Sequence, residues 1–413
     1  MKISELRDKK IAILGFGVEG QATLRFLKHF FPEKEIGIVD QKDGPDYLEK
    51  LKDYDLVVKT AGIPGGKVSQ KYTTATNIFF ANTKCKVVGV TGTKGKSTTT
   101  SLIFEMLKVD GKDVRLVGNI GIPMLNELLI EEPKDRIYVC ELSSYQLEDL
   151  RLSPHVAVFI NFFPDHLDYH GGLENYWSAK KNIISFQTEK DYFVYNSDFE
   201  ELKKLAKEGR GVAVPFMEKL PFVSEIIPLL GKHNVDNVRA AAAAARILGV
   251  NDAVIEKAVR EFKPLPHRLE KVGTFKGITF YDDAISTTPE STIAGIEALS
   301  HVGTIFLGGT DRGYNFDLLA QKIFEKGIGA VVLFPESGAR ILKALKKVST
   351  EMGLSVPKIF ATDDMKMALV FAYDNTPKGT ICLLSTASPS YSLWRNFEEK
   401  GELFQNFVKE LGQ

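Results

Sequence analysis

The sequence predicts an α/β protein of three domains, each built around a largely parallel sheet. Short apolar runs alternate with amphipathic segments along nearly the whole chain, which is the pattern of strand–helix–strand units. The chain has 413 residues, which is more than one hydrophobic core usually supports and suits two or three domains. Pro264 and Pro266 stand close together, as is typical of a linker. We therefore expect domains over residues 1–84, 85–265 and 266–413.

The first domain is expected to be Rossmann-like. An apolar run at residues 11–14 leads into the glycine sequence GFGVEG at 15–20, a predicted helix around 21–29, and a second apolar run at 36–39 that is followed by Asp40. In dinucleotide-binding domains such glycines admit a diphosphate and such an acid contacts a ribose. The same turn also occurs in sheets that bind other nucleotides or none. The pattern alone therefore leaves NAD, another nucleotide and simple packing as alternatives.

The second domain carries the strongest motif. An apolar run at residues 86–90 leads into TGTKGKST at 91–98 and a predicted helix over 99–108. This is a P-loop, in which backbone N–H groups hold phosphates, Lys96 reaches the terminal phosphates and the Ser97 hydroxyl ligates magnesium. It departs from the general pattern because Val90 stands at the first glycine position, so the turn uses Gly92 and Gly95.

Two further strand ends in this domain carry polar residues. Glu141 follows the apolar run at 137–140, and Asp165, His166 and Asp168 follow the run at 156–160. The carboxyl ends of strands in a P-loop sheet are where magnesium ligands are needed, so these residues predict a metal site. Turn or capping roles are the alternative.

An alanine-rich helix and a third sheet follow. Asn234 and Asn237 lie three residues apart near the start of the helix, where their amides could hydrogen-bond a base or cap the helix. Beyond the prolines, apolar runs at 278–281, 304–307, 330–334, 358–361 and 380–384 predict a second Rossmann-like domain.

Composition excludes several classes of protein. Lys plus Arg and Asp plus Glu both number 53, so there is no basic excess of the kind that binds nucleic acid. The first apolar run is too short for a signal peptide, and no run approaches the ~20 residues that span a bilayer. The three cysteines are far apart in the sequence, which disfavours disulfides and a zinc site. We expect a cytoplasmic monomer that binds neither nucleic acid nor a membrane.

Taken together, the motifs resemble those of the Mur ligase family, which are ATP-dependent amide-forming enzymes of peptidoglycan synthesis. The matching segments, in order, are TGTKGKST, GNIGIP at 118–123, ELSSYQLE at 141–148, DHLDYH at 165–170, GKHNVDN at 231–237 and LPHR at 265–268. GFGVEG, LLSTASPS at 383–390 and NFEEKG at 396–401 are most similar to the members that join D-glutamate to UDP-N-acetylmuramoyl-L-alanine. The resemblance implies an acyl-phosphate intermediate formed with ATP.

Other interpretations explain less of the sequence. A dehydrogenase that uses GFGVEG for NAD does not account for TGTKGKST. A nucleotide-driven switch does not account for DHLDYH with a lysine 14 residues beyond His166. A ligase of the same family that adds L-glutamate or another amino acid remains the alternative.

By position, the resemblance implies four groups of site residues. Contacts with the UDP-linked substrate would come from Gly17, Val18, Glu19, Asp40, Gln41, Asn119, Ser143 and Ser144. ATP would be held by Gly92, Thr93, Lys94, Gly95, Lys96, Ser97, Thr98, Asn234, Asn237, Arg268 and Asp283. Two magnesium ions would be bound through Ser97, Glu141, His166 and a carbamylated Lys180, with Lys96, Glu141, His166 and Lys180 as the catalytic group. Glutamate would lie against Arg312, Ser390 and Phe397.

Two positions need comment. The family usually reads NDSKATN where this chain has DDAISTT at 282–288, so Ile285 replaces a lysine and a positive charge near the acceptor is missing. Judged by its own segment, Lys180 is an ordinary solvated helix lysine beside Lys181. Only the resemblance makes it a carbamylated metal ligand.

Overall fold

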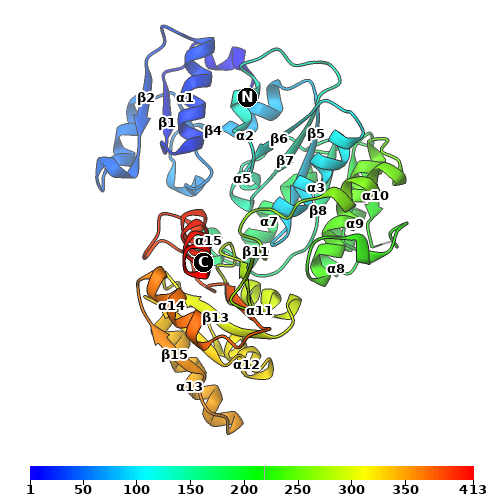
Figure 1. Cartoon of the computed structure of the whole chain (residues 1–413). Helices are drawn as coiled ribbons and strands as arrows, with labels where there is room; N and C mark the ends of the chain where they lie inside the picture. The colour runs from blue at the N-terminus through cyan, green and yellow to red at the C-terminus, as the bar shows by residue number, and fades with distance from the viewer. Residues whose placement is uncertain (218) are drawn as a thin grey trace. The chain divides into compact units, whose positions relative to one another are not determined.

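The computed structural model describes residues 1–217 and 219–413, and it contains three sheets flanked by helices (Figure 1). By its contacts the chain forms two compact units, which are Met1–Ile227 with His233–Phe262, and Pro228–Lys232 with Lys263–Gln413. The boundary predicted at 84/85 lies inside the first unit, and the one predicted at 265/266 lies a few residues after the start of Lys263–Gln413. Among the described residues, no helix has the length and apolar character that crossing a membrane requires.

The first sheet of the first unit has four parallel strands in the order β2-β1-β3-β4. The inner strand β1 is buried along its whole length, and Gly15, with φ +90°, turns the chain directly after it. The strands are β1 (Ile11–Leu14), β2 (Ile36–Val39), β3 (Leu56–Lys59) and β4 (Tyr72–Thr74), and the helices are α1 (Val18–Phe30) and α2 (Ala75–Asn82).

The second sheet has six parallel strands in the order β10-β9-β8-β5-β7-β6, which places β5 in the middle. The strands are β5 (Lys86–Thr91), β6 (Val114–Gly118), β7 (Ile137–Glu141), β8 (Val156–Phe159), β9 (Tyr192–Tyr195) and β10 (Val212–Pro215). The helices are α3 (Lys96–Val109), α4 (Met124–Glu127), α5 (Ser144–Glu148), α6 (Leu167–His170), α7 (Leu173–Ser185), α8 (Glu200–Glu208), α9 (Lys232–Ile247) and α10 (Asp252–Glu261). In a parallel sheet the loops after β5, β7 and β8 meet at one edge.

One hydrophobic core joins the first two sheets. The same cluster contains Phe26 of the first sheet's layer and Tyr138 of the second, and the rings of Phe79 and Tyr138 meet edge-on with centroids 5.0 Å apart. The Lys59 ammonium also lies 2.8 Å from the Asp149 carboxylate, and both side chains are almost fully buried. Breaking a buried ion pair leaves an uncompensated charge, so these contacts hold the two sheets as one body.

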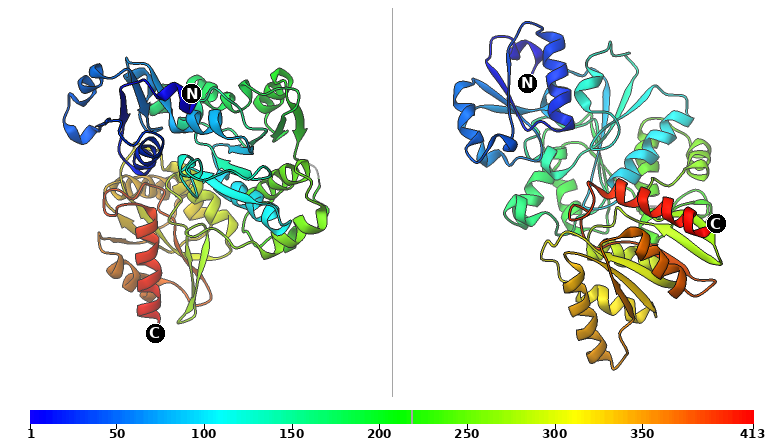
Figure 2. Two further views of the ribbon diagram at one scale, coloured as in Figure 1. Left: turned by 90° about the horizontal axis from the view of Figure 1, so that it is seen from above. Right: turned by 60° about the vertical axis from the view of Figure 1, so that its left-hand side comes forward.

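The third sheet forms the core of the second unit, in the order β11-β12-β16-β13-β14-β15. Helices α11, α12 and α13 cover one face, and α14 and α15 cover the other (Figure 2). The strands are β11 (Glu270–Phe275), β12 (Ile278–Asp282), β13 (Val302–Gly308), β14 (Ala330–Phe334), β15 (Lys358–Ala361) and β16 (Ile381–Leu384). The helices are α11 (Pro289–Ala298), α12 (Asp317–Glu325), α13 (Gly338–Met352), α14 (Met365–Asn375) and α15 (Phe397–Gly412).

The predicted apolar runs leave out β3, β4, β6, β9 and β10 of the first unit. In the third sheet, the strand that they leave out is β11. It is antiparallel to β12 at the edge of the sheet, and its residues are only partly buried. An edge strand exposed in this way needs no continuous apolar run, which explains why the sequence pattern misses it.

Candidate active site

The predicted P-loop is a tight turn between the buried strand β5 and helix α3. Gly95, which precedes the helix, has φ +84°, a conformation that glycine adopts without strain. A Cβ atom there would also lie 2.4 Å from Asn237 Oδ1, so a larger residue would clash with α9. The first turn of α3 carries N–H groups without intrahelical partners, and a helix N-terminus favours anions. The turn therefore has the geometry of a phosphate site.

Two lysines from different elements share one carbonyl oxygen of this turn. Lys96 donates from Nζ to the backbone oxygens of Gly92 and Thr93 at 3.1 and 3.0 Å. Lys180, from α7, donates to the same Gly92 oxygen at 2.7 Å. Lys96 is half-buried and folds back over the loop. The shared acceptor places the two amines close together.

Lys180 is buried, in contrast to its neighbour. Its side chain is 1% exposed, whereas Lys181 pairs with Glu208 at the surface. Burial is the main reason why the pKa of Lys180 lies well below its ordinary value, and the charge of Lys96 lowers it further. The interpretation of Lys180 as a solvated helix lysine is therefore wrong, and its burial disfavours the ammonium form of the amine.

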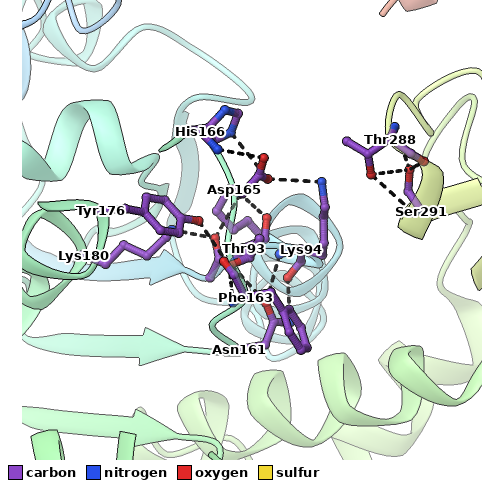
Figure 3. Close-up of polar contacts among 12 residues, drawn as sticks. Thr93, Lys94, Asn161, Phe163, Asp165, His166, Tyr176, Lys180, Thr288 and Ser291 are labelled. Carbon is purple, nitrogen blue, oxygen red and sulfur yellow. Dashed lines mark hydrogen bonds and ion pairs between the residues drawn. The ribbon is translucent and has the colours of Figure 1, made fainter. Parts of the chain in front are cut away.

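The predicted metal-binding side chains lie around this turn. Glu141, at the end of β7, is 2% exposed; its Oε1 accepts from Asn119 at 3.0 Å, and its Oε2 is buried without a hydrogen-bond partner among the described residues. His166 lies beside Asp165, 3.6 Å from its carboxylate (Figure 3). Burial, with the charges of nearby lysines, lowers the pKa of His166 against the opposing charge of Asp165, and so favours the neutral ring that can ligate a metal. A buried carboxylate oxygen without a partner fits a bound Mg²⁺.

Four of the predicted substrate residues line one cavity of about 420 Å³ in the first unit. Val18 and Glu19 reach it from the start of α1, and Asn119 and Ser143 reach it from loops after β6 and β7. Tyr145 and Gln146 also line it, although the sequence did not single them out. The cavity thus combines residues from both of the first two predicted domains.

The other predicted substrate residues have supporting positions. Gly17 is the N-cap of α1, and the exposed Gln41 follows Asp40. The Asp40 carboxylate accepts the Phe16 N–H at 2.7 Å and so holds the glycine turn. Ser144 is buried and its hydroxyl lies 3.0 Å from His170 Nε2, so the two adjacent serines point to different partners.

The remaining predicted nucleotide residues are divided between the units. Asn237 is 2% exposed, donates to Asn234 Oδ1 at 2.8 Å and accepts from Thr99 of α3. It therefore joins α9 to the helix that carries the P-loop. In the second unit Arg268 leads into β11, and the buried Asp283 accepts from Ser385, with burial raising its pKa to about 7.

In the second unit, the predicted glutamate residues surround loops at the carboxyl edge of the sheet. Thr310, after β13, donates its N–H to the Pro389 oxygen at 2.8 Å. The hydroxyls of Thr310 and Ser390 are both buried without hydrogen-bond partners among the described residues. Arg312 is exposed on the same loop as Thr310, and Phe397 begins α15. Thr310 was missed because a lone threonine after a glycine pair carries no recognisable pattern.

A buried lysine lies under the loop that carries Ser390. Lys400 is 0% exposed, donates to the Thr386 hydroxyl at 2.6 Å, and burial lowers its pKa to about 7.

The described residues contain one further group of potential metal ligands, His267, Glu270 and Asp282. Gln405 donates to both carboxylates, at 3.0 and 2.9 Å, and His267 lies 2.7 Å from Asp282. These groups therefore satisfy one another, which is typical of a structural cluster rather than an ion site.

Comparisons with known proteins show which proteins the chain is similar to. A family model described as the Mur ligase middle domain matches residues 90–219. The chain is 32% identical to a UDP-N-acetylmuramoylalanine–D-glutamate ligase of Acetivibrio thermocellus, over 98% of this chain and 97% of that protein. It is 33% identical to the ligase of the same name from Ligilactobacillus salivarius, over 99% of this chain and 98% of that protein.

Solved structures share the fold. UDP-N-acetylmuramate–alanine ligase MurC from Thermotoga maritima matches with a TM-score of 0.62 at 19% identity, over 98% of this chain and 99% of that one. MurF ligase from the same organism, solved in complex with ADP, matches with a TM-score of 0.62 at 16% identity, over 99% of this chain and 97% of that one. The predicted three-domain α/β class is thereby confirmed.

Proposed function

The chain belongs to the Mur ligase family, and we propose that it joins D-glutamate to UDP-N-acetylmuramoyl-L-alanine with conversion of ATP to ADP and phosphate. The relatives that match almost its whole length carry the name of this activity. Within the molecule, one observation carries the proposal. Tyr145 lines the cavity of the first unit, and its ring lies 5.2 Å from the ring of His166. A substrate in that cavity therefore adjoins the predicted phosphoryl-transfer site.

The P-loop is proposed to hold ATP. The first turn of α3 would bind the phosphates, and Lys96 would leave its loop carbonyls to neutralise charge on the transferring phosphoryl group. The alanyl carboxylate attacks the γ-phosphorus, giving an acyl phosphate and ADP. The amine of glutamate then attacks the activated carbonyl carbon, and phosphate leaves.

Ser97, Glu141, His166 and a carbamylated Lys180 would hold Mg²⁺. When bound, the metal supplies charge neutralisation at the phosphoryl oxygens. The oxygen of Glu141 that has no hydrogen-bond partner supports this assignment.

The surroundings of Lys180 support its proposed carbamylation. A neutral amine adds carbon dioxide and loses one proton, so a potential cation becomes an anion that can ligate magnesium. The buried position of Lys180, next to the charge of Lys96, disfavours the ammonium form that would block this addition.

The acceptor glutamate is proposed to bind in the second unit. Arg312 would pair with a carboxylate, and the hydroxyls of Ser390 and Thr310, which are buried without partners, would donate to it, while Phe397 would bound the site. Arg268 and Asp283 would contact the nucleotide.

A phosphate-release assay tests the function directly. We expect ATP-dependent phosphate release with UDP-N-acetylmuramoyl-L-alanine only when an amino acid is added, and most rapidly with D-glutamate in a panel of D- and L-amino acids. Faster phosphate release with L-glutamate or a diamino acid would assign the chain a different activity within the same family. Release that needs no acceptor would contradict the ligase assignment.

Arg312 gives a second test. Arg312→Ala is expected to raise the apparent KM for glutamate about tenfold or more, because one charge-assisted bidentate contact is lost. Arg312→Lys should recover only part of the affinity, since lysine keeps the charge without the planar fork. The KM for ATP serves as the internal control. An equal rise in both values would place Arg312 outside the glutamate site.

A further inference from the structure

Asn161 follows β8 and makes several hydrogen bonds to the P-loop, although neither the motifs nor the proposed function assign it a role. Its Oδ1 accepts the backbone N–H groups of both Thr93 and Lys94, each at 3.0 Å. Its Nδ2 donates to the Lys94 oxygen at 3.0 Å, and its own backbone oxygen accepts from Thr93 at 3.1 Å (Figure 3). One side chain thus satisfies three backbone groups of the turn.

These bonds decide which donors of the turn face a phosphate. The N–H groups of Thr93 and Lys94 are directed at Asn161 and are thereby removed from the set available to an anion. The intrahelical bonds of α3 begin with Thr99 N–H to the Gly95 oxygen. The phosphate-binding donors are therefore confined to the start of the helix, where the helix dipole favours negative charge.

The same contact reaches the two lysines of the site. The oxygen of Gly92, directly before Thr93, accepts from both Lys96 and Lys180. A Cβ atom on Gly92 would lie 3.3 to 3.4 Å from Ile160 and Asn161, so the turn is packed closely against the end of β8. On the opposite side, the Thr93 hydroxyl lies 3.1 Å from the Tyr176 hydroxyl. A shift of the turn would therefore move both amines.

We propose that Asn161 is a positioning residue for ATP, which fixes the strand-to-helix turn before the nucleotide binds so that the start of α3 and Lys96 meet the phosphates. This inference rests on the proposed function. A turn that is already ordered pays less conformational entropy on binding, so its contribution is to nucleotide affinity rather than to the binding of the UDP-linked substrate.

The test compares Asn161→Ala, Asn161→Asp and the wild type. The control is Asn196→Ala. Asn196 is a buried asparagine directly after the neighbouring strand β9, and its Oδ1 accepts the backbone N–H of Asp198. Calorimetry measures binding of ADP and, separately, of UDP-N-acetylmuramoyl-L-alanine. Hydrogen exchange is followed in peptides that contain residues 93 and 94.

We expect Asn161→Ala to weaken ADP binding at least about tenfold, to leave binding of the UDP-linked substrate within about twofold, and to speed exchange at residues 93 and 94. Asn161→Asp keeps the accepting oxygens, so exchange should stay slow while its added charge still weakens ADP binding. Asn196→Ala should match the wild type in both measurements. Should the alanine variant not fold, Asn161→Leu supplies the same two readouts, because leucine is similar in size to asparagine and makes none of these hydrogen bonds.

The outcomes separate the two proposals. A wild type that binds no ADP would overturn the proposed function and this inference with it. If the wild type binds ADP but the Asn161 variants change neither the ADP affinity nor the hydrogen exchange at residues 93 and 94, only this inference is overturned. If Asn161→Ala lost the same affinity for ADP and for the UDP-linked substrate, and the aspartate variant exchanged as fast as the alanine variant, Asn161 would have a general structural role. That result would contradict the positioning role.

Discussion

Lys180→Ala is expected to lose at least about 100-fold of the ligase turnover, because it removes the carbamate that is proposed to hold magnesium. The folded state should persist, since alanine removes a buried amine whose charged form is unfavourable there. The measurement is ADP formation at saturating substrates, accompanied by a thermal melt. Isotopically labelled bicarbonate should give a carbamate signal in the wild type that is missing in the variant.

Two companion experiments sharpen this result. Lys181→Ala is the matched control, because Lys181 is the next residue of the same helix and pairs with Glu208 at the surface. Its turnover should equal that of the wild type. Acetate added to Lys180→Ala should restore part of the activity by placing a carboxylate in the vacated space. Full turnover of Lys180→Ala would refute the metal-ligand role, and loss without rescue by acetate or any carbamate signal would refute carbamylation.

The second large effect is expected at the P-loop. Lys96→Ala should reduce ADP formation at least about 100-fold, because this ammonium is proposed to neutralise the transferring phosphoryl group. Stability should change little, since the side chain is half-buried and its bonds to the Gly92 and Thr93 oxygens lie within one loop. Turnover and the melting temperature are measured on the same preparation.

Lys108→Ala provides the control for Lys96. Lys108 lies in the last turn of the same helix and pairs with Glu105 at the surface. Its removal changes the net charge by the same amount without reaching the turn. If Lys96→Ala kept near-normal turnover, or if Lys108→Ala lost as much, the assignment of the phosphate site to this loop would be wrong.

The sequence by itself determined the elements whose causes are local. The P-loop is predictable because strand, glycine turn and helix are consecutive. In addition, the turn requires a positive φ at position 95, and the glycine there indicates it. Parallel sheets follow from the alternation of apolar runs and amphipathic segments. The family also follows from motif order along the chain, and full-length relatives confirm it.

Only the tertiary structure decided the properties that depend on distant partners. Lys180 and Lys181 are adjacent and identical in type, yet only the packing of α7 against the P-loop buries one of them. Ser143 and Ser144 are likewise adjacent and identical in type, yet Ser143 lines the cavity and Ser144 contacts His170. Burial and hydrogen-bond partners arise from residues far along the chain, so no local pattern encodes them.

The same reason explains Asn161, which is an ordinary residue after a strand until the fold places it against Thr93 and Lys94. These residues are separated by more than sixty positions, and a side chain's role at such a contact depends on the register of parallel strands that only the assembled sheet sets. Motifs therefore predicted the chemistry of this protein, whereas the packing of β5 between β7 and β8 decided which amines, amides and hydroxyls lie around the P-loop.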